Sequence, residues 1–161
     1  MIPRDFSPLR RLVLKGAGLV ALMGLAQTGV GVRAARAATD KYPEDAFKQK
    51  SDAEAIKVLY GKSAESSAEI KLDAPEIAEN GGVVPISVTT TLAGVTSISF
   101  LVSENPNALA ASYLIPEGTV PSVANRLKMA KTSNVIAIVE ANGKLYSATK
   151  EVKVTVGGCG G

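Results

Sequence analysis

The chain has 161 residues, enough for one ordinary domain. Its formal charge of +3 depends on the first 37 residues: without them 12 basic and 14 acidic residues remain, a charge of −2, so no clustered positive charge indicates a nucleic-acid-binding protein. The sequence contains no histidine, which excludes a Ser-His-Asp triad, a Cys-His pair and a histidine metal site. We therefore expect neither a metal nor a cofactor.

Residues 1–37 predict an export signal. Arg10 and Arg11 precede the apolar stretch GAGLVALMGLAQTGVGV, and small residues ending in Ala37 are typical of a cleavage site. The run LRRLVLK matches the twin-arginine pattern at Arg10, Arg11, Leu14 and Lys15 but departs from it at Leu9 and Val13. An ordinary secretory signal is the alternative. Either signal predicts a periplasmic protein. The apolar stretch is too short to span a bilayer as a helix, and we expect no membrane contact once the signal has been removed.

Residues 38–69 are predicted to form an N-terminal helical segment. Good helix formers dominate residues 44–60, and Gly61 follows as a natural helix stop. The apolar side chains in this stretch are separated by charged residues and alanines. We expect a single amphipathic helix over residues 44–60.

From residue 70 the hydrophobic pattern changes to that of β-strands. Apolar residues alternate along 84–92, 98–102 and 152–156, and residues 135–139 form a continuous apolar run. The dipeptide Asn142-Gly143 predicts a tight type I′ hairpin, since both positions tolerate positive φ. Six or seven short strands separated by turn signals favour an immunoglobulin-like antiparallel β-sandwich over residues 70–156, a mainly β fold.

The sequence ends in Gly157-Gly158-Cys159-Gly160-Gly161, which contains its only cysteine. Glycine samples φ of either sign, so we expect residues 157–161 to form a flexible arm that carries Cys159 about 10 Å beyond Val156. A single cysteine makes no internal disulfide, and no base or histidine accompanies it. We interpret Cys159 as an attachment site on which other enzymes act. A frayed terminus with an incidental cysteine is the alternative.

The ending KVTVGGCGG resembles the C-terminus of the SoxY family, the sulfur-compound carriers of the bacterial Sox thiosulfate-oxidation system. Further blocks similar to that family are AFKQKSDAEAIKVLYG (46–61), APEIAENGGVVPISV (74–88), SENPNALAASYLIP (103–116) and RLKMAKTSNVIAIVEANGKLYSATKEVKVTVGGCGG (126–161). Together these blocks cover nearly all of the chain after the predicted signal.

The resemblance implies a covalent carrier that is not itself an enzyme. The Cys159 thiol would accept thiosulfate oxidatively to give a cysteine S-thiosulfonate, and later adducts would stay on the same sulfur. The family works as a heterodimer with SoxZ, and its adducts are processed by the c-type cytochrome SoxXA, the hydrolase SoxB and a sulfur dehydrogenase. These partners are implied by the resemblance alone.

Two other functions compete with this interpretation. One is an exported immunoglobulin-like structural or adhesion domain that is cross-linked through Cys159. The other is a ubiquitin-like sulfur carrier with a thiocarboxylate on Gly161, which requires adenylation in the cytoplasm and conflicts with the predicted export signal. Weaker candidates for an ion pair or a partner interface are Arg126, Tyr60, Tyr113 and Tyr146, with core burial favoured for most of the tyrosines.

Overall fold

The computed structural model describes residues 42–158, so the predicted signal at 1–37 and the residues Cys159, Gly160 and Gly161 lie outside the described part. The helices are α2 (Glu44–Phe47) and α3 (Asp52–Tyr60). The nine strands of this part are β1 (Glu65–Ser66), β2 (Ile70–Asp73), β3 (Ile77–Asn80), β4 (Val84–Thr90), β5 (Val95–Val102), β6 (Leu109–Leu114), β7 (Ser122–Leu127), β8 (Ser133–Ala141) and β9 (Lys144–Val156). No helix within residues 42–158 is both long and apolar enough to cross a membrane.

The single helix predicted for residues 44–60 is wrong, because the structure interrupts it between α2 and α3. Ser51 has extended backbone angles, and its side chain accepts a hydrogen bond from the Glu54 amide at 3.3 Å. Ser51 Oγ also donates to the Glu54 carboxylate at 3.0 Å, and with Ser51 as its N-cap a new helix starts at Asp52. The predicted stop is confirmed: Gly61 adopts a left-handed conformation with φ of 68° and caps α3.

The strands form two sheets. The large sheet has the order β1-β9-β8-β5-β6, with β3 also paired to β9, and the small sheet has the order β2-β4-β7. All strand pairs are antiparallel except two, since β1 and β3 each run parallel to β9. The predicted mainly β fold is confirmed, and its strand pairs are antiparallel apart from those of β1 and β3 with β9. The two exceptions arise because β1 and β3 reach β9 from a distant part of the sequence rather than through a hairpin.

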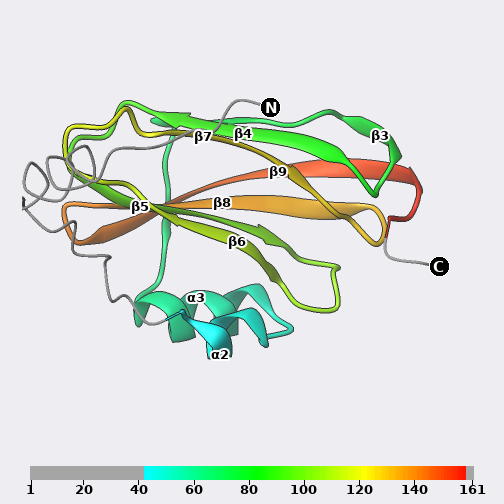
Figure 1. Ribbon diagram of the computed structural model, residues 1–161, viewed down its shortest axis with the longest axis horizontal. Helices are drawn as coiled ribbons and strands as arrows, with labels where there is room; N and C mark the ends of the chain where they lie inside the picture. Colours follow the sequence, from blue (N-terminus) through cyan, green and yellow to red (C-terminus); the bar gives the residue numbers. More distant parts are fainter. Residues whose placement is uncertain (1–41, 159–161) are drawn as a thin grey trace, which may run out of the picture. The chain divides into compact units, whose positions relative to one another are not determined.

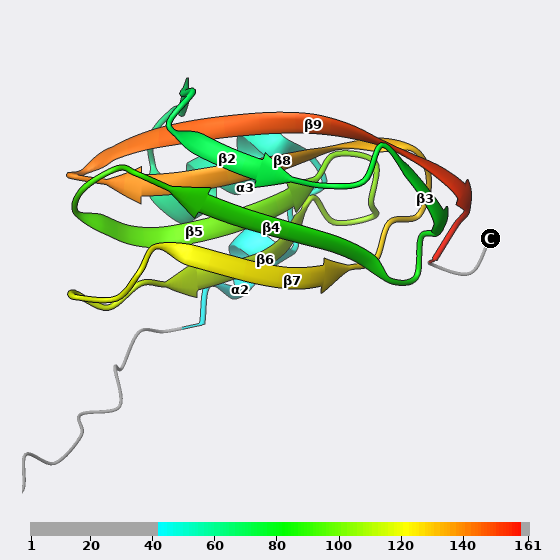
Figure 2. The same ribbon diagram turned by 90° about the horizontal axis from the view of Figure 1, so that it is seen from above.

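The large sheet is covered on both faces (Figures 1 and 2). On one face it packs against the small sheet, and the buried residues between them include Phe100, Val102, Val135, Val139, Ile86, Val88, Met129 and Val152. On the other face the two helices bury a second cluster that includes Ala46, Ala55, Leu101, Ile138 and Leu145. The continuous apolar run at 135–139 follows from this arrangement, because both sides of β8 face protein.

The hairpin between β8 and β9 confirms the prediction made for Asn142-Gly143. Asn142 has a φ of 50° and Gly143 a φ of 73°, the signs that a type I′ turn requires. From this turn β9 runs for 13 residues, past the end of its pairing with β8 at Val152. Its final residues pair with β3 instead, which brings the end of β9 to one end of the molecule (Figure 1).

A hydroxyl network joins α3 to the large sheet. Tyr60 Oη lies 2.7 Å from Ser99 Oγ and 3.1 Å from Ser97 Oγ, and Ser99 Oγ donates to Ser112 Oγ at 2.8 Å. Both Ser97 and Ser99 are buried, because they alternate with the core residues of β5 and face the helices. The tyrosine hydroxyl therefore supplies a hydrogen-bond partner for serines that have little access to water.

The network predicts a loss of stability in Tyr60→Phe. Removing the hydroxyl takes a hydrogen-bond partner from buried Ser97 and Ser99, which is expected to lower the free energy of unfolding by about 1–3 kcal/mol. Urea unfolding of the variant and the unchanged protein measures this difference. Tyr42→Phe is the matched control, because Tyr42 is 63% exposed and its stacking on Phe47 needs only the ring. Equal losses in the two variants would contradict the structural role of the network.

The same hydroxyl predicts an alkaline loss of stability. Burial raises the pKa of Tyr60, an effect that outweighs the hydrogen bonds from Ser97 and Ser99, which lower it. The Tyr60 hydroxyl therefore keeps its proton to higher pH in the folded protein than in the unfolded chain. Its contribution to the free energy of unfolding is constant below about pH 10 and falls above that pH. Urea unfolding between about pH 8 and about pH 11 should show the stability gap to Tyr60→Phe narrowing as pH rises. A gap of constant size would refute this assignment.

Candidate functional site

The end of β9 lies against two loops. One segment, residues 80–83, runs from Asn80, the last residue of β3, to the start of β4, and the other, residues 128–132, joins β7 to β8. Gly157 and Gly158 follow β9 directly and contact both loops. We call the cluster of residues 81–82, 129–130 and 157–158 the junction, because it connects the folded domain to the cysteine-containing tail.

Three backbone hydrogen bonds hold the junction together. The Gly81 amide donates to the Val156 carbonyl at 2.8 Å, and the Met129 amide donates to the Gly81 carbonyl at 2.7 Å. The Gly158 amide then donates to the Met129 carbonyl at 2.9 Å. These bonds link both loops to the last residues of the described chain.

The glycines of the junction are required by close approach. A Cβ atom on Gly158 would overlap the backbone of Gly81 and Gly82, and one on Gly157 would overlap the Ala130 carbonyl oxygen. A Cβ atom on Gly81 would overlap the Met129 carbonyl oxygen and would lie 2.9 Å from the Gly158 amide nitrogen. The first two residues of the predicted arm therefore lie against the loops: Gly157 is exposed but close to Ala130, and Gly158 is half-buried and hydrogen-bonded.

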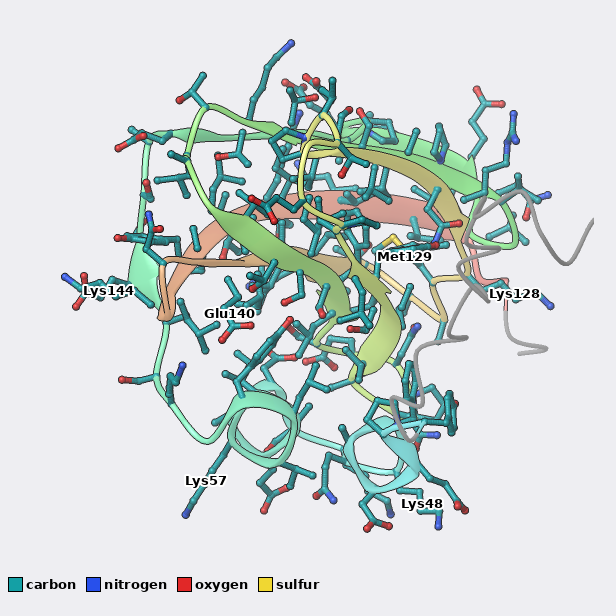
Figure 3. All side chains as sticks on the ribbon, turned by 60° about the vertical axis from the view of Figure 1, so that its left-hand side comes forward. Lys48, Lys57, Lys128, Met129, Glu140 and Lys144 are labelled. Carbon is teal, nitrogen blue, oxygen red and sulfur yellow. The ribbon has the colours of Figure 1, made fainter. Side chains whose placement is uncertain are left out.

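The loop at 128–132 is itself anchored. The Met129 side chain is wholly buried between the sheets, where Figure 3 shows it pointing into the interior. Asn105, from the loop after β5, donates from Nδ2 to the Lys128 carbonyl at 2.8 Å and accepts the Ala130 amide at Oδ1 at 2.9 Å. Thr132 Oγ1 accepts the Val154 amide at 2.9 Å. The carbonyl that binds Gly158 is thus fixed by the core on one side and by Asn105 on the other.

The side chains around the junction carry charge but supply no catalytic set. Lys131 Nζ forms an ion pair with Glu104 at 2.7 Å, and both side chains are largely exposed. Lys128 lies at the same end of the molecule as the end of β9 (Figure 3). Within residues 42–158 no group of three histidine, cysteine, aspartate or glutamate side chains is arranged to hold a metal ion. The junction instead consists of backbone groups that hold Gly158 against both loops.

None of the secondary candidates from the sequence belongs to the junction as defined above. Arg126 is exposed beside a surface cavity of about 660 Å³ on the small sheet, and within the described part it forms no ion pair. Tyr60 belongs to the hydroxyl network, and Tyr146 packs against the core between the sheets. Tyr113 is 36% exposed, packs edge-on against Phe100 and accepts a hydrogen bond from Asn125. Tyr60 and Tyr146 are therefore half-buried at the edges of the two core clusters and are not fully buried core residues.

The residues that contact Gly157 and Gly158 were not predicted from the sequence. Two adjacent glycines, as at Gly81-Gly82, are typical of a turn and also of a close backbone approach, so this pair was the one available signal. Nothing in the sequence distinguishes Met129 and Asn105 from other core and loop residues. Cys159, Gly160 and Gly161, the other predicted site residues, lie outside the described residues.

Comparison with known proteins gives consistent results. The family profile described as sulfur oxidation protein SoxY matches residues 56–159, more than half of the chain. The structure is similar to that of the sulfur carrier protein SoxY from Chlorobium limicola f thiosulfatophilum, with 42% identity, a TM-score of 0.59, and coverage of 65% of this chain and 96% of that chain.

A weaker similarity, to superoxide reductase (neelaredoxin) from Ignicoccus hospitalis, has 22% identity and a TM-score of 0.47 over 53% of this chain and 79% of that chain, which is too distant to inform function. No curated protein sequence matches the chain. The profile match and the 42% identical structure agree with each other and with the blocks that first indicated the family: this chain belongs to the SoxY family of sulfur oxidation proteins.

Proposed function

We propose that this protein carries sulfur-oxidation intermediates covalently on the thiol of Cys159 and presents them to partner enzymes. The observation that carries the proposal is membership in the SoxY family, with the profile match extending to Cys159, the only cysteine of the chain. The junction supports it, since Gly158, the residue before Cys159, is hydrogen-bonded to the domain. A thiol suits this cargo because thiols and sulfane sulfur exchange through sulfur–sulfur bonds.

The proposed chemistry begins with an oxidative coupling. The thiol loses its proton, a bond forms between Cys159 Sγ and the terminal sulfur of thiosulfate, and an electron pair passes to a c-type cytochrome, which leaves a cysteine S-thiosulfonate. Water then cleaves the bond to the sulfone sulfur, which releases sulfate and leaves a persulfide on Cys159. An oxidising enzyme then removes six electrons from the outer persulfide sulfur and passes them to its electron acceptor, while three water molecules supply the oxygen atoms of the resulting sulfonate. A second hydrolysis releases another sulfate and regenerates the thiol. The carrier itself is not the catalyst of these steps.

The partners and the location complete the proposal. We assign the roles of cytochrome, hydrolase and oxidising enzyme to SoxXA, SoxB and a sulfur dehydrogenase, and the role of heterodimer partner to SoxZ. The protein acts in the periplasm after export by the twin-arginine pathway, which the sequence of residues 1–37 supports. The assignment of the two-sheet domain to the immunoglobulin-like class belongs to the same proposal.

The carrier function predicts mass additions on one residue. Protein isolated from cells that oxidise thiosulfate should contain species heavier by sulfur or by sulfur and oxygen atoms, and peptide mapping should place every addition on Cys159. Intact-mass spectrometry measures the additions. They should disappear after treatment with a reducing agent, because each is held through a sulfur–sulfur bond.

Cys159→Ser is the control for this prediction and should carry no addition. Additions that persist in this variant would refute the carrier function. Modification of the Gly161 carboxylate would favour a ubiquitin-like carrier, and a protein isolated only as a Cys159 disulfide dimer without adducts would favour the cross-linked structural domain.

The twin-arginine signal predicts that lysine substitutions at two pairs of arginines affect export differently. The double variant Arg10→Lys, Arg11→Lys should stay in the cytoplasm, because the twin-arginine pathway recognises arginine whereas an ordinary signal needs only positive charge. The matched control is Arg33→Lys, Arg36→Lys, which makes the same change outside the twin-arginine pattern. Cell fractionation and immunoblotting measure the location. Normal export of the Arg10, Arg11 variant would indicate the ordinary secretory route.

A further inference from the structure

We propose that the junction is a clamp that fixes the root of the carrier arm at Gly158, the last described residue before Cys159. The inference rests on the proposed carrier function for its purpose. Its physical content concerns Gly81, Met129 and Gly158, all within the described residues. Met129 and Gly81 are positioning residues in this account, since they act through Gly158 and not on the cargo.

The first argument is the connection between the clamp and the core. Gly158 donates to the Met129 carbonyl, and the Met129 side chain is completely buried between the two sheets. Met129 also donates to Gly81, a buried residue that donates in turn to the Val156 carbonyl. Displacing Gly158 therefore breaks its hydrogen bond to the Met129 carbonyl. The hydrogen bond between Met129 and Gly81 remains and keeps the two loops in place.

The second argument is steric. Space for Gly158 exists only because neither Gly158 nor Gly81 has a side chain, since a Cβ on either would meet backbone atoms of the other or of its neighbours. Backbone atoms of a hydrogen-bonded turn move less readily than the end of a flexible side chain. A tail that moved freely from Val156 onward would not require such a close fit. The close fit therefore indicates a specific binding position for Gly158.

The consequence for the carrier is a short reach. Because consecutive Cα atoms are about 3.8 Å apart, clamping Gly158 keeps the Cα atom of Cys159 within that distance of the junction. A partner enzyme that takes up the thiol must then approach the loops at 80–83 and 128–132 closely. These loops, with Lys128 and Lys131 on one of them, form part of the surface that each such enzyme contacts.

Gly158→Ala tests the clamp from the side of the arm. Hydrogen exchange of the full-length protein, followed by NMR, should show a protected amide at residue 158 in the unchanged protein. In the variant this amide should exchange about tenfold faster, the effect of losing one backbone hydrogen bond. The amides of Gly81 and Met129 serve as internal references and should keep their protection. Gly160→Ala, which changes the same residue type two positions further on, should leave residue 158 protected.

Asn105→Ala tests the clamp from the side of the loop while leaving the arm unchanged. Asn105 braces the loop through Lys128 and Ala130, so its loss should also speed exchange at the Gly158 amide. The control is Asn107→Ala, an exposed residue of the same loop whose side chain makes no hydrogen bond within residues 42–158. An unprotected Gly158 amide in the unchanged protein, or equal exchange in all variants, would overturn the clamp.

Thiol reactivity separates a positioning role from a merely structural one. Releasing the clamp should raise the rate at which Cys159 reacts with a long polyethylene glycol maleimide relative to N-ethylmaleimide, because the thiol then reaches further from the domain. The ratio should rise in Gly158→Ala and Asn105→Ala and stay unchanged in Gly160→Ala and Asn107→Ala. An unchanged ratio in all four variants would overturn the positioning role. None of these measurements needs a sulfur adduct, so they remain decisive even if the carrier function fails.

Discussion

The pairing of β5 with β8 at the centre of the large sheet is the contact on which the other elements depend. Both strands are buried on both faces, so they provide apolar surface that must be covered from two directions. The small sheet covers one face, and α2 and α3 cover the other. Burial of this kind is the main favourable term in folding, and it explains why two short helices that would be marginal alone are retained on the sheet.

The junction connects this buried core to the end of β9. Met129 occupies the core with its side chain and binds Gly158 with its carbonyl, so one residue connects the packed interior to the tail. In the proposed carrier function, a fixed arm root would reduce the conformational entropy that a partner enzyme has to remove when it binds the thiol. A tail without a fixed root would add to that entropic cost at each transfer.

Glycine serves two different physical purposes in this chain. Gly61 and Gly143 have positive φ and allow a helix cap and a hairpin turn, and sequence reasoning predicted both from their neighbours. Gly81 and Gly158 are needed because backbone segments from distant parts of the sequence meet there without room for a Cβ atom. The first purpose depends on local conformation, and the second depends on what the fold brings together.

The sequence by itself determined the mainly β class, the end of α3 at Gly61, the hairpin at Asn142-Gly143 and the family, because each depends on local backbone preference or on a contiguous run of residues. Only the tertiary structure decided that β1 and β3 join β9 in parallel, that Ser97 and Ser99 face a helix, and that Gly158 is bound by Met129. Residue 158 lies 29 positions from Met129 and 77 from Gly81 in the sequence. Hydrophobic periodicity specifies which face of a strand is buried, but it contains no information about which distant loop will meet the end of that strand.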